Sequence, residues 1–419
     1  MIELLPVKGY LATTTRAMCA RARVSQKTYY LQFGNKEGYF LATYWTIVRQ
    51  AVDRVNAAYR AKSEWTEQIQ AGFDVFIDEV VSQPGAARLA LVEALGAGPK
   101  ALEAMTTAHT DFERILGSTF ANSPEPVELP PIVLKAIAGG VARVVRQRLL
   151  DGRAPDLRGE APELLRWMLA YHSNAARMLP PVPPPSTTRP TRREPKPGAA
   201  DDRERMMEAA TLLAVRYGFA NVSAAKIIQQ AGVSDPIFFD RFPSGVEECF
   251  MAAYNQMGDE VAAYVAEAAV TETYWPRAVR AAMAALLWRI ASDEVFAQVA
   301  FVQVFSAGPA TVAGRSRLMA SFSDLLLSHS PPNQRPSVLV AEAIVGAIWQ
   351  IVHHYVVRGA ARQLPILTDL ATYIVLVPAL GGEAAMTEIH AAHKASATHV
   401  EQPRDLSATT PTDATAAVD

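Results

Sequence analysis

The chain has 419 residues and a formal net charge of −2 at pH 7. This length suits two domains, each of a size that buries most of its surface. The near-neutral charge excludes a protein that coats nucleic acid through bulk charge, so any nucleic-acid contact has to come from a local basic patch. The sequence shows no signal peptide at its start and no uninterrupted apolar stretch of about 18 residues, so we expect a cytoplasmic protein without a membrane span.

The sequence of the first half is repeated in the second. Residues 9–33 align without gaps with residues 218–242, and Gly98-Pro99 aligns further along with Gly308-Pro309. A repeat of about two hundred residues is far longer than the roughly 20–50 residues of a solenoid unit, so each copy should be a complete domain. We therefore expect an all-α chain of two tandem domains that together imitate a homodimer.

The first head is predicted over residues 1–45 as a helix-turn-helix. Thr14 is placed to cap one short helix, residues 23–25 form the turn, and residues 26–32 form a second short helix. Only eight residues, one of them proline, precede Gly9, so the helix that covers the other two in such a head is mostly absent. Either the chain starts further upstream or this head is unstable alone.

The same head carries a basic and hydroxyl-rich surface, because residues 14–36 contain five basic side chains and no acidic one. The second helix of a helix-turn-helix enters the major groove, and Gln26, Lys27 and Thr28 stand at its start, where side chains reach base edges. Tyr30 and Lys36 are better placed for the phosphate backbone. The alternative is a solvated basic face. The predicted DNA contacts of the first head are Thr14, Thr15, Arg16, Ser25, Gln26, Lys27, Thr28, Tyr29, Tyr30 and Lys36.

Long amphipathic helices follow in the first body, predicted over residues 46–178. The helix at 130–150 contains Gly139, and its counterpart in the second copy contains Gly346; small residues of this kind let helices approach closely. We interpret these two helices as the seam between the halves, with tight packing inside one domain as the alternative. The proline-rich residues 179–201 are predicted to form a semi-rigid linker.

The second head, predicted over residues 202–254, keeps the helix-turn-helix pattern but loses the positive charge. Over residues 223–245 two aspartates oppose two basic side chains. Because carboxylates repel phosphates, we expect this head to bind weakly, to read a different half-site or to serve as scaffold. The second body is predicted over residues 255–382, and residues 383–419, poor in large apolar side chains, are predicted to be a disordered tail. The predicted contacts of the second head are Ser223, Ser234, Asp235 and Phe239.

No motif supports catalysis, a cofactor or a metal. The sequence contains no Gly-x-Ser-x-Gly, no Gly-Lys-Ser/Thr phosphate loop, no Cys-x-x-Cys and no His-Glu-x-x-His. His353 and His354 are adjacent, so they cannot form the i, i+4 ligand pair of a zinc site, and each is interpreted as a polar wall or a seam residue. Cys19 and Cys249 lack metal-ligand spacing and are predicted to be buried thiols.

A specific pattern runs through the first head, with Thr14-Thr15 followed by residues 24–33 and then by Lys36 and Phe40. It resembles the DNA-binding signature of the tetracycline-repressor-like (TetR) family of transcriptional regulators. The resemblance implies a three-helix head that binds a double-stranded DNA operator as a dimer, and a helical body that binds a small-molecule effector and so relieves repression. We therefore expect a ligand-released repressor whose first head dominates the DNA contact.

The second copy resembles the same family through residues 231–234, although Phe239 stands where the family has a phosphate-contacting tyrosine and Gly245 where it has a lysine. The two copies together would form a pseudo-two-fold single-chain dimer, and further self-association stays open. The alternative function is a ligand-sensing or protein-interaction scaffold that has lost DNA binding.

The resemblance also implies an effector pocket among the long helices of each body. Its lining would come from large apolar side chains, each of which is also explained as ordinary core. The candidates are Phe73, Phe76, Phe112, Trp275, Trp288, Phe301 and Phe305.

Overall fold

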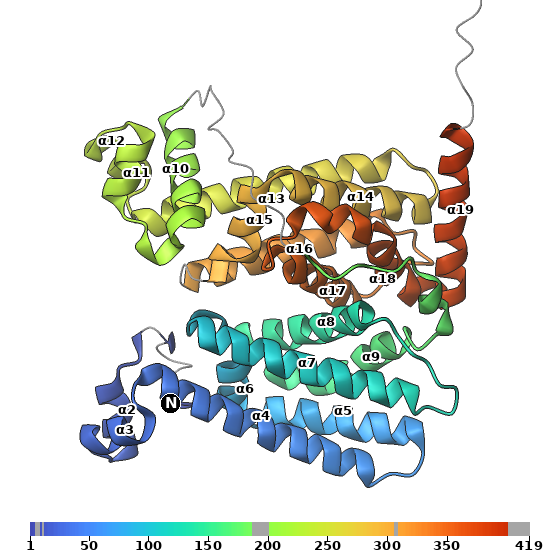
Figure 1. Ribbon diagram of the computed structural model, residues 1–419, viewed down its shortest axis with the longest axis horizontal. Helices are drawn as coiled ribbons and strands as arrows, with labels where there is room; N and C mark the ends of the chain where they lie inside the picture. The colour runs from blue at the N-terminus through green and yellow to red at the C-terminus, as the bar shows by residue number, and fades with distance from the viewer. Residues whose placement is uncertain (5–8, 11, 187–200, 306–308, 401–419) are drawn as a thin grey trace, which may run out of the picture.

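The computed structural model describes residues 1–4, 9–10, 12–186, 201–305 and 309–400, except for the side chains of residues 305, 309–312 and 395–400. Every regular element in these residues is a helix (Figure 1), which confirms the predicted all-α fold. The physical reason is the helical spacing of apolar residues, which gives each segment one face to bury.

The first half consists of a small head followed by a longer helical body (Figure 1). Its helices are α2 (Thr15–Ala22), α3 (Gln26–Phe33), α4 (Lys36–Arg60), α5 (Trp65–Ser82), α6 (Pro84–Leu91), α7 (Pro99–Ala121), α8 (Pro131–Leu150) and α9 (Leu157–Leu169). Its short 3-10 helices are η1 (Glu93–Gly96), η2 (Ala154–Asp156) and η3 (Asn174–Met178).

The second half has the same succession of short and long helices, with the further helices α10 at its start and α19 at its end. Its helices are α10 (Asp202–Tyr217), α11 (Ala224–Ala231), α12 (Asp235–Arg241), α13 (Val246–Val270), α14 (Trp275–Ser292), α15 (Glu294–Phe301), α16 (Pro309–His329), α17 (Val338–Val356), α18 (Thr368–Leu380) and α19 (Gly382–Val400). Its 3-10 helices are η4 (Phe219–Asn221), η5 (Gln303–Phe305) and η6 (Ala361–Leu367).

The bodies of the two halves match in helix length as well as in helix order. Helices α4 and α13 each have 25 residues, α5 and α14 each have 18, and α6 and α15 each have 8. Local sequence sets many of the boundaries. Pro84, Pro99 and Pro131 stand in the first turns of α6, α7 and α8, where the missing N–H of proline costs no hydrogen bond.

Helices α8 and α17 pack against each other and join the two halves (Figure 1). A Cβ built on Gly139 would lie 2.2 Å from the Cβ of Gln350, and one built on Gly346 would lie 2.4 Å from the Cβ of Arg143. Neither position has room for a side chain, so these two glycines set how closely the helices approach. We call this contact between α8 and α17 the seam.

The seam is buried and continues into both bodies. Side chains of α8 and α17, among them Val144 and Ile351, belong to one hydrophobic core that also includes residues of both bodies. An ion pair crosses the seam, because a guanidinium nitrogen of Arg148 lies 2.9 Å from a carboxylate oxygen of Glu342. The halves are therefore held together by a shared core and not by the linker alone.

The structure corrects the predicted tail. Residues 382–400 form helix α19, which packs against α14, α18 and η3. Ala385, Met386 and Ile389 are at most 1% exposed, and the His393 Nε2 lies 2.6 Å from a carboxylate oxygen of Asp369. The prediction of disorder from residue 383 is therefore wrong up to residue 400, because a short apolar stripe at helical spacing is enough to hold the helix. Residues 401–419 lie outside the described part of the chain.

The start of the predicted linker lies against the second half. The Tyr355 hydroxyl donates a hydrogen bond to the Pro183 carbonyl at 2.5 Å, and Gln363 bonds to Ser186. Residues 187–200 of the predicted linker are outside the described part of the chain. The first residues of this segment therefore pack against the second half, whereas its proline content predicted a linker.

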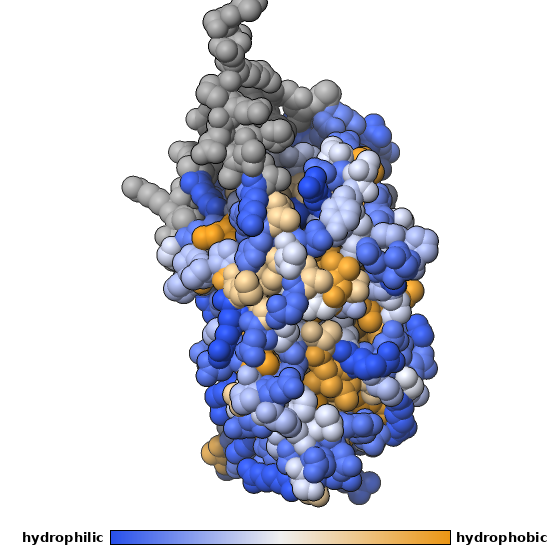
Figure 2. All heavy atoms as spheres, turned by 90° about the vertical axis from the view of Figure 1, so that its right-hand side faces the viewer, coloured by the Kyte–Doolittle hydropathy of each residue, from blue (hydrophilic) through white to orange (hydrophobic). Residues whose placement is uncertain are grey.

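Both heads lie at one end of the molecule, on the left in Figure 1, and the bodies extend away from them. Seen from the opposite end, the surface is mostly hydrophilic with small apolar patches between the polar side chains (Figure 2). Two segments of the described chain, Val338–Val356 and Ala361–Leu380, are long and apolar enough to cross a membrane, but 56% of each is buried inside the protein. Their apolar faces are used in the core.

Candidate nucleic-acid interface

The first head folds into two short helices joined by a tight turn, as predicted. The Thr14 side chain caps α2 by accepting a backbone hydrogen bond at 3.2 Å, and the Ser25 side chain caps α3 in the same way at 3.0 Å. Arg23 ends α2 in the left-handed backbone region with φ 56°. The matching position of the second head is Gly232, with φ 66°, which glycine adopts without steric cost.

Helix α3 presents most of its side chains to solvent. Gln26, Lys27 and Thr28 are exposed at its start, and Tyr30 is 48% exposed. The Thr15 hydroxyl on α2 lies 3.4 Å from the Tyr30 hydroxyl, which holds the phenol beside the first helix. Such groups are the donors and acceptors that contact base edges and phosphates.

The exposed basic side chains lie around this helix. Arg16 and Arg23 on or beside α2 and Lys27 on α3 are all exposed, whereas Arg21 forms an ion pair with Glu3. Because both partners of that pair are exposed, it contributes little to stability. The face that surrounds α3 therefore carries a local excess of positive charge on a chain whose net charge is close to zero.

The prediction of Tyr29 as a DNA contact is wrong. Its side chain is 3% exposed and packs with Met18 and Cys19 in the core of the head. Burial raises the pKa of Tyr29 to about 12. Successive residues of a helix point about 100° apart, so Tyr29 faces inward where Tyr30 faces outward.

Lys36 lies at the first position of α4, where the head joins the body. Its ammonium donates a hydrogen bond to the Tyr10 carbonyl at 2.6 Å and lies 4.1 Å from the centre of the Tyr10 ring. Burial lowers the pKa of Lys36. In this structure Lys36 joins the start of α4 to residue 10, and its contact with a phosphate stays a prediction.

The first head has a much smaller core than the second. Its buried hydrophobic residues are Met18, Cys19 and Tyr29. In the second head α10 adds Met206 and Ala210, among others, to a core that also contains residues of α11, α12 and α13. Among the described residues before α2 no helix of comparable length covers the first head. Cys19 and Cys249 are both buried thiols, as predicted.

The second head reproduces the geometry of the first with different chemistry. The rings of Tyr29 and Tyr30 lie 5.4 Å apart at 89°, and those of Phe238 and Phe239 lie 5.2 Å apart at 87°. Phe238 is fully buried, and Phe239 is 48% exposed, the same fraction as Tyr30. The outward ring of the second head thus occupies the same place but has no hydroxyl to donate.

The other predicted contacts of the second head lie on its surface, where basic and acidic side chains are mixed. Ser223 caps α11 at 3.4 Å, while the Ser234 side chain makes no capping bond to α12. Asp235 is exposed at the first position of α12, and Asp240 lies 3.9 Å from Arg241. The start of this helix therefore presents a carboxylate where α3 presents an amide and an ammonium.

The first body encloses a mostly apolar cavity of about 400 Å³. Helices α4, α5, α6, α7 and α8 line it, and the predicted residues Phe73, Phe76 and Phe112 all contribute to its wall. Cavities of several hundred Å³ with apolar walls and few polar groups are where proteins bind small molecules. We call it the first-body cavity.

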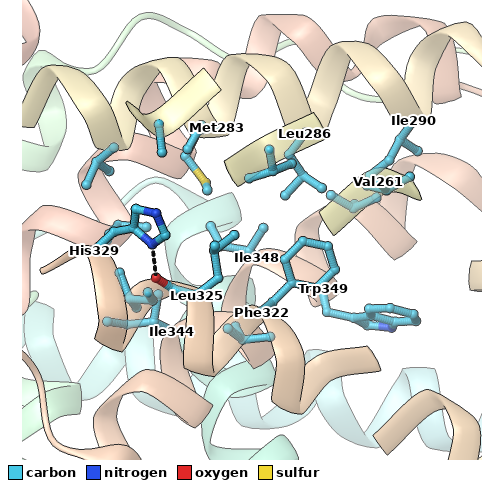
Figure 3. A pocket seen from close by; sticks show the side chains of 18 of the residues that line it. Val261, Met283, Leu286, Ile290, Phe322, Leu325, His329, Ile344, Ile348 and Trp349 are labelled. Carbon is cyan, nitrogen blue, oxygen red and sulfur yellow. Dashed lines mark hydrogen bonds between the residues drawn. The ribbon is translucent and has the colours of Figure 1, made fainter. Parts of the chain in front are cut away.

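The second body contains a smaller apolar cavity of about 110 Å³ (Figure 3). Trp275 and Phe301, two of the predicted pocket residues, line it together with Met283 and Trp349, and their contact with an effector stays a prediction. The His329 Nδ1 donates to the Leu325 carbonyl at 2.9 Å, so its ring is fixed at the wall. We call it the second-body cavity.

The prediction of Trp288 as a pocket residue is wrong. It is 54% exposed and lies beside Tyr264, with ring centres 6.0 Å apart. Trp288 lines neither the first-body nor the second-body cavity. Its neighbour Leu287 points inward from α14 and is fully buried. The side chain of Phe305 lies outside the described part of the chain.

An exposed helix-turn-helix with a basic, hydroxyl-rich outer face is the arrangement with which helix-turn-helix proteins contact DNA. Residues 2–43 match the family model described as "Bacterial regulatory proteins, tetR family". The first head is therefore a DNA-binding domain of the tetR type, which supports a transcriptional regulator. The match covers the head only and leaves both bodies and the second head outside it.

Two other comparisons add little. No curated protein matches the chain. Among solved structures, the chain is similar to the one described as "Structural analysis of fatty acid degradation regulator FadR from Bacillus halodurans", at 14% identity over 43% of this chain and 96% of that chain, with a TM-score of 0.39. A similarity at this level carries no argument about the bodies.

Proposed function

We propose that this protein is a cytoplasmic transcriptional repressor that binds an operator in double-stranded DNA mainly through its first head, and that a small molecule bound in its bodies releases it. The observation that carries the proposal is the exposed start of α3, where Gln26, Lys27 and Thr28 stand on a face with Arg16 and Arg23 beside it. Gln pairs with adenine and Lys with guanine in the major groove, so this helix has the chemistry for reading bases.

We propose further that the two halves are a duplicated domain and form a pseudo-two-fold dimer on one chain. Gly139 contacts Gln350, and Gly346 contacts Arg143, which is the reciprocal pattern of an isologous interface. Arg143 and Gln350 stand four residues after Gly139 and Gly346 respectively, so each glycine contacts the counterpart of the residue that contacts the other.

A matched pair of hydrogen bonds supports the same proposal. Arg146 Nε donates to the carbonyl of Leu91, the last residue of α6, at 2.8 Å, and His353 Nδ1 donates to the carbonyl of Phe301, the last residue of α15, at 2.9 Å. Arg146 and His353 each stand seven residues after the matching glycines of the seam. The matched positions thus make the same kind of bond in both halves, although the side chain differs.

The unequal heads support an asymmetric operator. A homodimer with identical heads favours a palindrome, whereas a chain with two different heads can read two different half-sites. A weak second head still adds avidity, because its contact is intramolecular once the first head is bound. Both heads lie at the same end of the molecule (Figure 1), as simultaneous contact with one duplex requires.

The proposal is tested by binding to duplex DNA. Fragments selected by the purified full chain from random duplexes are titrated at several salt concentrations, and log affinity should fall steeply with log salt, since basic side chains displace counterions. Lys27→Ala should weaken binding to the selected fragment by about 1–3 kcal/mol. Lys62→Ala removes the same charge just beyond the far end of α4 and should change nothing. Little binding at any salt concentration would contradict the proposal and favour a scaffold.

The asymmetry of the heads makes a separate prediction. Replacing Asp235 and Asp240 together by asparagine should raise affinity for the selected fragment by up to about tenfold at low salt, because two carboxylates no longer repel phosphates. The same titration measures the change, and Glu103→Gln on the exposed face of α7 is the matched control. If alanine at Phe239 weakens binding as much as alanine at Tyr30 does, the first head does not dominate.

A further inference from the structure

A third cavity lies at the seam, between the two bodies. It measures about 60 Å³ and is lined by α7 and α8 of the first half and by α16 and α17 of the second. Since roughly 10–15 Å³ holds one water molecule, this volume suits a group of the size of a carboxylate or phosphate. We call it the seam cavity. The polar residues of its wall that matter for the argument are His109, Glu113, Lys135, Arg146, Arg315 and His353.

Positive charge dominates the wall of the seam cavity. Arg146 is 7% exposed and Arg315 is 6% exposed, so both guanidinium groups are buried. Burial, followed by the neighbouring charges of Arg146 and Arg143, lowers the pKa of Arg315, which reflects how closely these cations are grouped. Moving cations out of water costs free energy that a facing anion offsets.

The described residues that line this cavity carry more positive than negative charge. Among the described residues that line it, Glu113 is the one carboxylate. Both of its oxygens accept hydrogen bonds from the Lys135 ammonium, at 2.7 and 2.8 Å, so this pair is internally neutral. The two arginines therefore contribute a net positive charge to the wall.

His109 adds a neutral hydrogen-bonding group to the same wall. Its Nε2 atom is closed off from solvent and has no hydrogen-bond partner among the described residues. Burial, together with the charge of Arg146, lowers the pKa of His109 to about 3, so the ring is neutral at physiological pH and can donate one N–H. His109 thus adds a neutral ring to a wall whose other titratable groups are mostly cationic.

We propose that the seam cavity binds an anionic group, a carboxylate or a phosphate, between Arg146 of the first half and Arg315 of the second. The inference rests on the proposed function and gives the effector a chemical class. Met105 and His109 line both the seam cavity and the first-body cavity. A molecule can thus place an apolar part in the first body and its anionic end at the seam, or a free inorganic anion can occupy the seam alone.

An anion in the seam cavity would contact helices of both halves at once. Arg315 lies on α16 with its guanidinium carbon 5.0 Å from the centre of the Trp349 ring, and Trp349 also lines the second-body cavity. Arg146 lies on α8, the seam helix of the first half, seven residues after Gly139. An anion between the two arginines therefore bridges helices from different halves, which gives the effector a direct means of changing how the heads are held.

The test uses the full chain with three probes, inorganic phosphate, acetate and hexanoate, in titration calorimetry and thermal melting. At least one probe should bind and raise the melting temperature, and Arg315→Met should weaken that binding about tenfold or more, since it removes a charge-assisted hydrogen bond. Arg315→Lys, which keeps the charge, should retain part of the affinity. Arg158→Met removes one exposed charge on α9 and should retain all of it.

The outcomes distinguish a free anion from the anionic end of a larger molecule, and they test the seam site separately from DNA binding. Binding of phosphate or acetate supports a free anion, and binding of hexanoate alone supports the anionic end of an apolar molecule. No binding of any probe to a chain that still binds its duplex overturns the inference and leaves the proposed function standing. Equal binding by Arg315→Met and the unmodified chain overturns it as well. Probe binding that depends on Arg315 without duplex binding would support the site and contradict the proposed function.

Discussion

Replacing Gly139 with alanine is expected to lower the free energy of unfolding by about 3 kcal/mol, the upper part of the usual range for overpacking a tightly packed core. The new Cβ would lie 2.2 Å from the Cβ of Gln350 and 3.2 Å from the carbonyl oxygen of Gly346. Since the obstacle includes backbone, α8 and α17 have to move apart. Gly346→Ala should have a similar effect, because its Cβ meets Arg143 at 2.4 Å.

Chemical denaturation of the full chain measures this change. Gly159→Ala on α9 is the control, because a Cβ at that position meets nothing within 4 Å. Alanine in a helix is favoured over glycine, so the control should be stabilised by about 0.5–1 kcal/mol. If Gly139→Ala unfolds at the same denaturant concentration as the unmodified chain, the two helices are not held at the distance that the structure gives.

Replacing Tyr29 with alanine is expected to unfold the first head while both bodies stay folded. Removing a buried aromatic side chain costs about 3–5 kcal/mol. The core of this head consists of Met18, Cys19 and Tyr29, so it has little stability to lose. Specific duplex binding should disappear, and amide hydrogen exchange over residues 15–33 should become fast while exchange in α8 and α17 is unchanged.

Tyr29→Phe separates packing from hydrogen bonding in the same position. The phenol donates only a 3.4 Å hydrogen bond to the Asn35 carbonyl, so the phenylalanine variant should fold and bind DNA nearly normally. Protected amides in the head of Tyr29→Ala would show that residues elsewhere hold it together. Loss of DNA binding by Tyr29→Phe would instead return Tyr29 to the list of direct contacts.

Local patterns predicted a large part of this protein. The apolar periodicity predicted the helices, and the capping residue Thr14 predicted the start of α2, because a cap acts within one turn of its own position. The exposed residues at the start of α3 also followed from local position. The small residues of the two seam helices predicted that these helices pack closely against each other.

Other predictions failed where a side chain's direction or partner depends on the whole fold. Tyr29 and Trp288 were assigned by residue type, yet the rotation of each helix against its neighbours turned one inward and the other outward. The apolar stripe of Ala385, Met386 and Ile389 was too short to predict an ordered helix from the sequence. In the structure α14, α18 and η3 supply the surface against which it packs. The composition of a segment does not show which other helices will pack against it.

The sequence by itself determined the helices and the basic character of the first head, since each of these depends on residues close together in the chain. Only the tertiary structure decided where the buried charged side chains lie relative to one another. Arg146, Arg315 and His109 come from three different helices of two halves, and nothing in their spacing shows that they share one wall. Long-range packing brings them together, because α8 and α17 approach closely enough at Gly139 and Gly346 to enclose them.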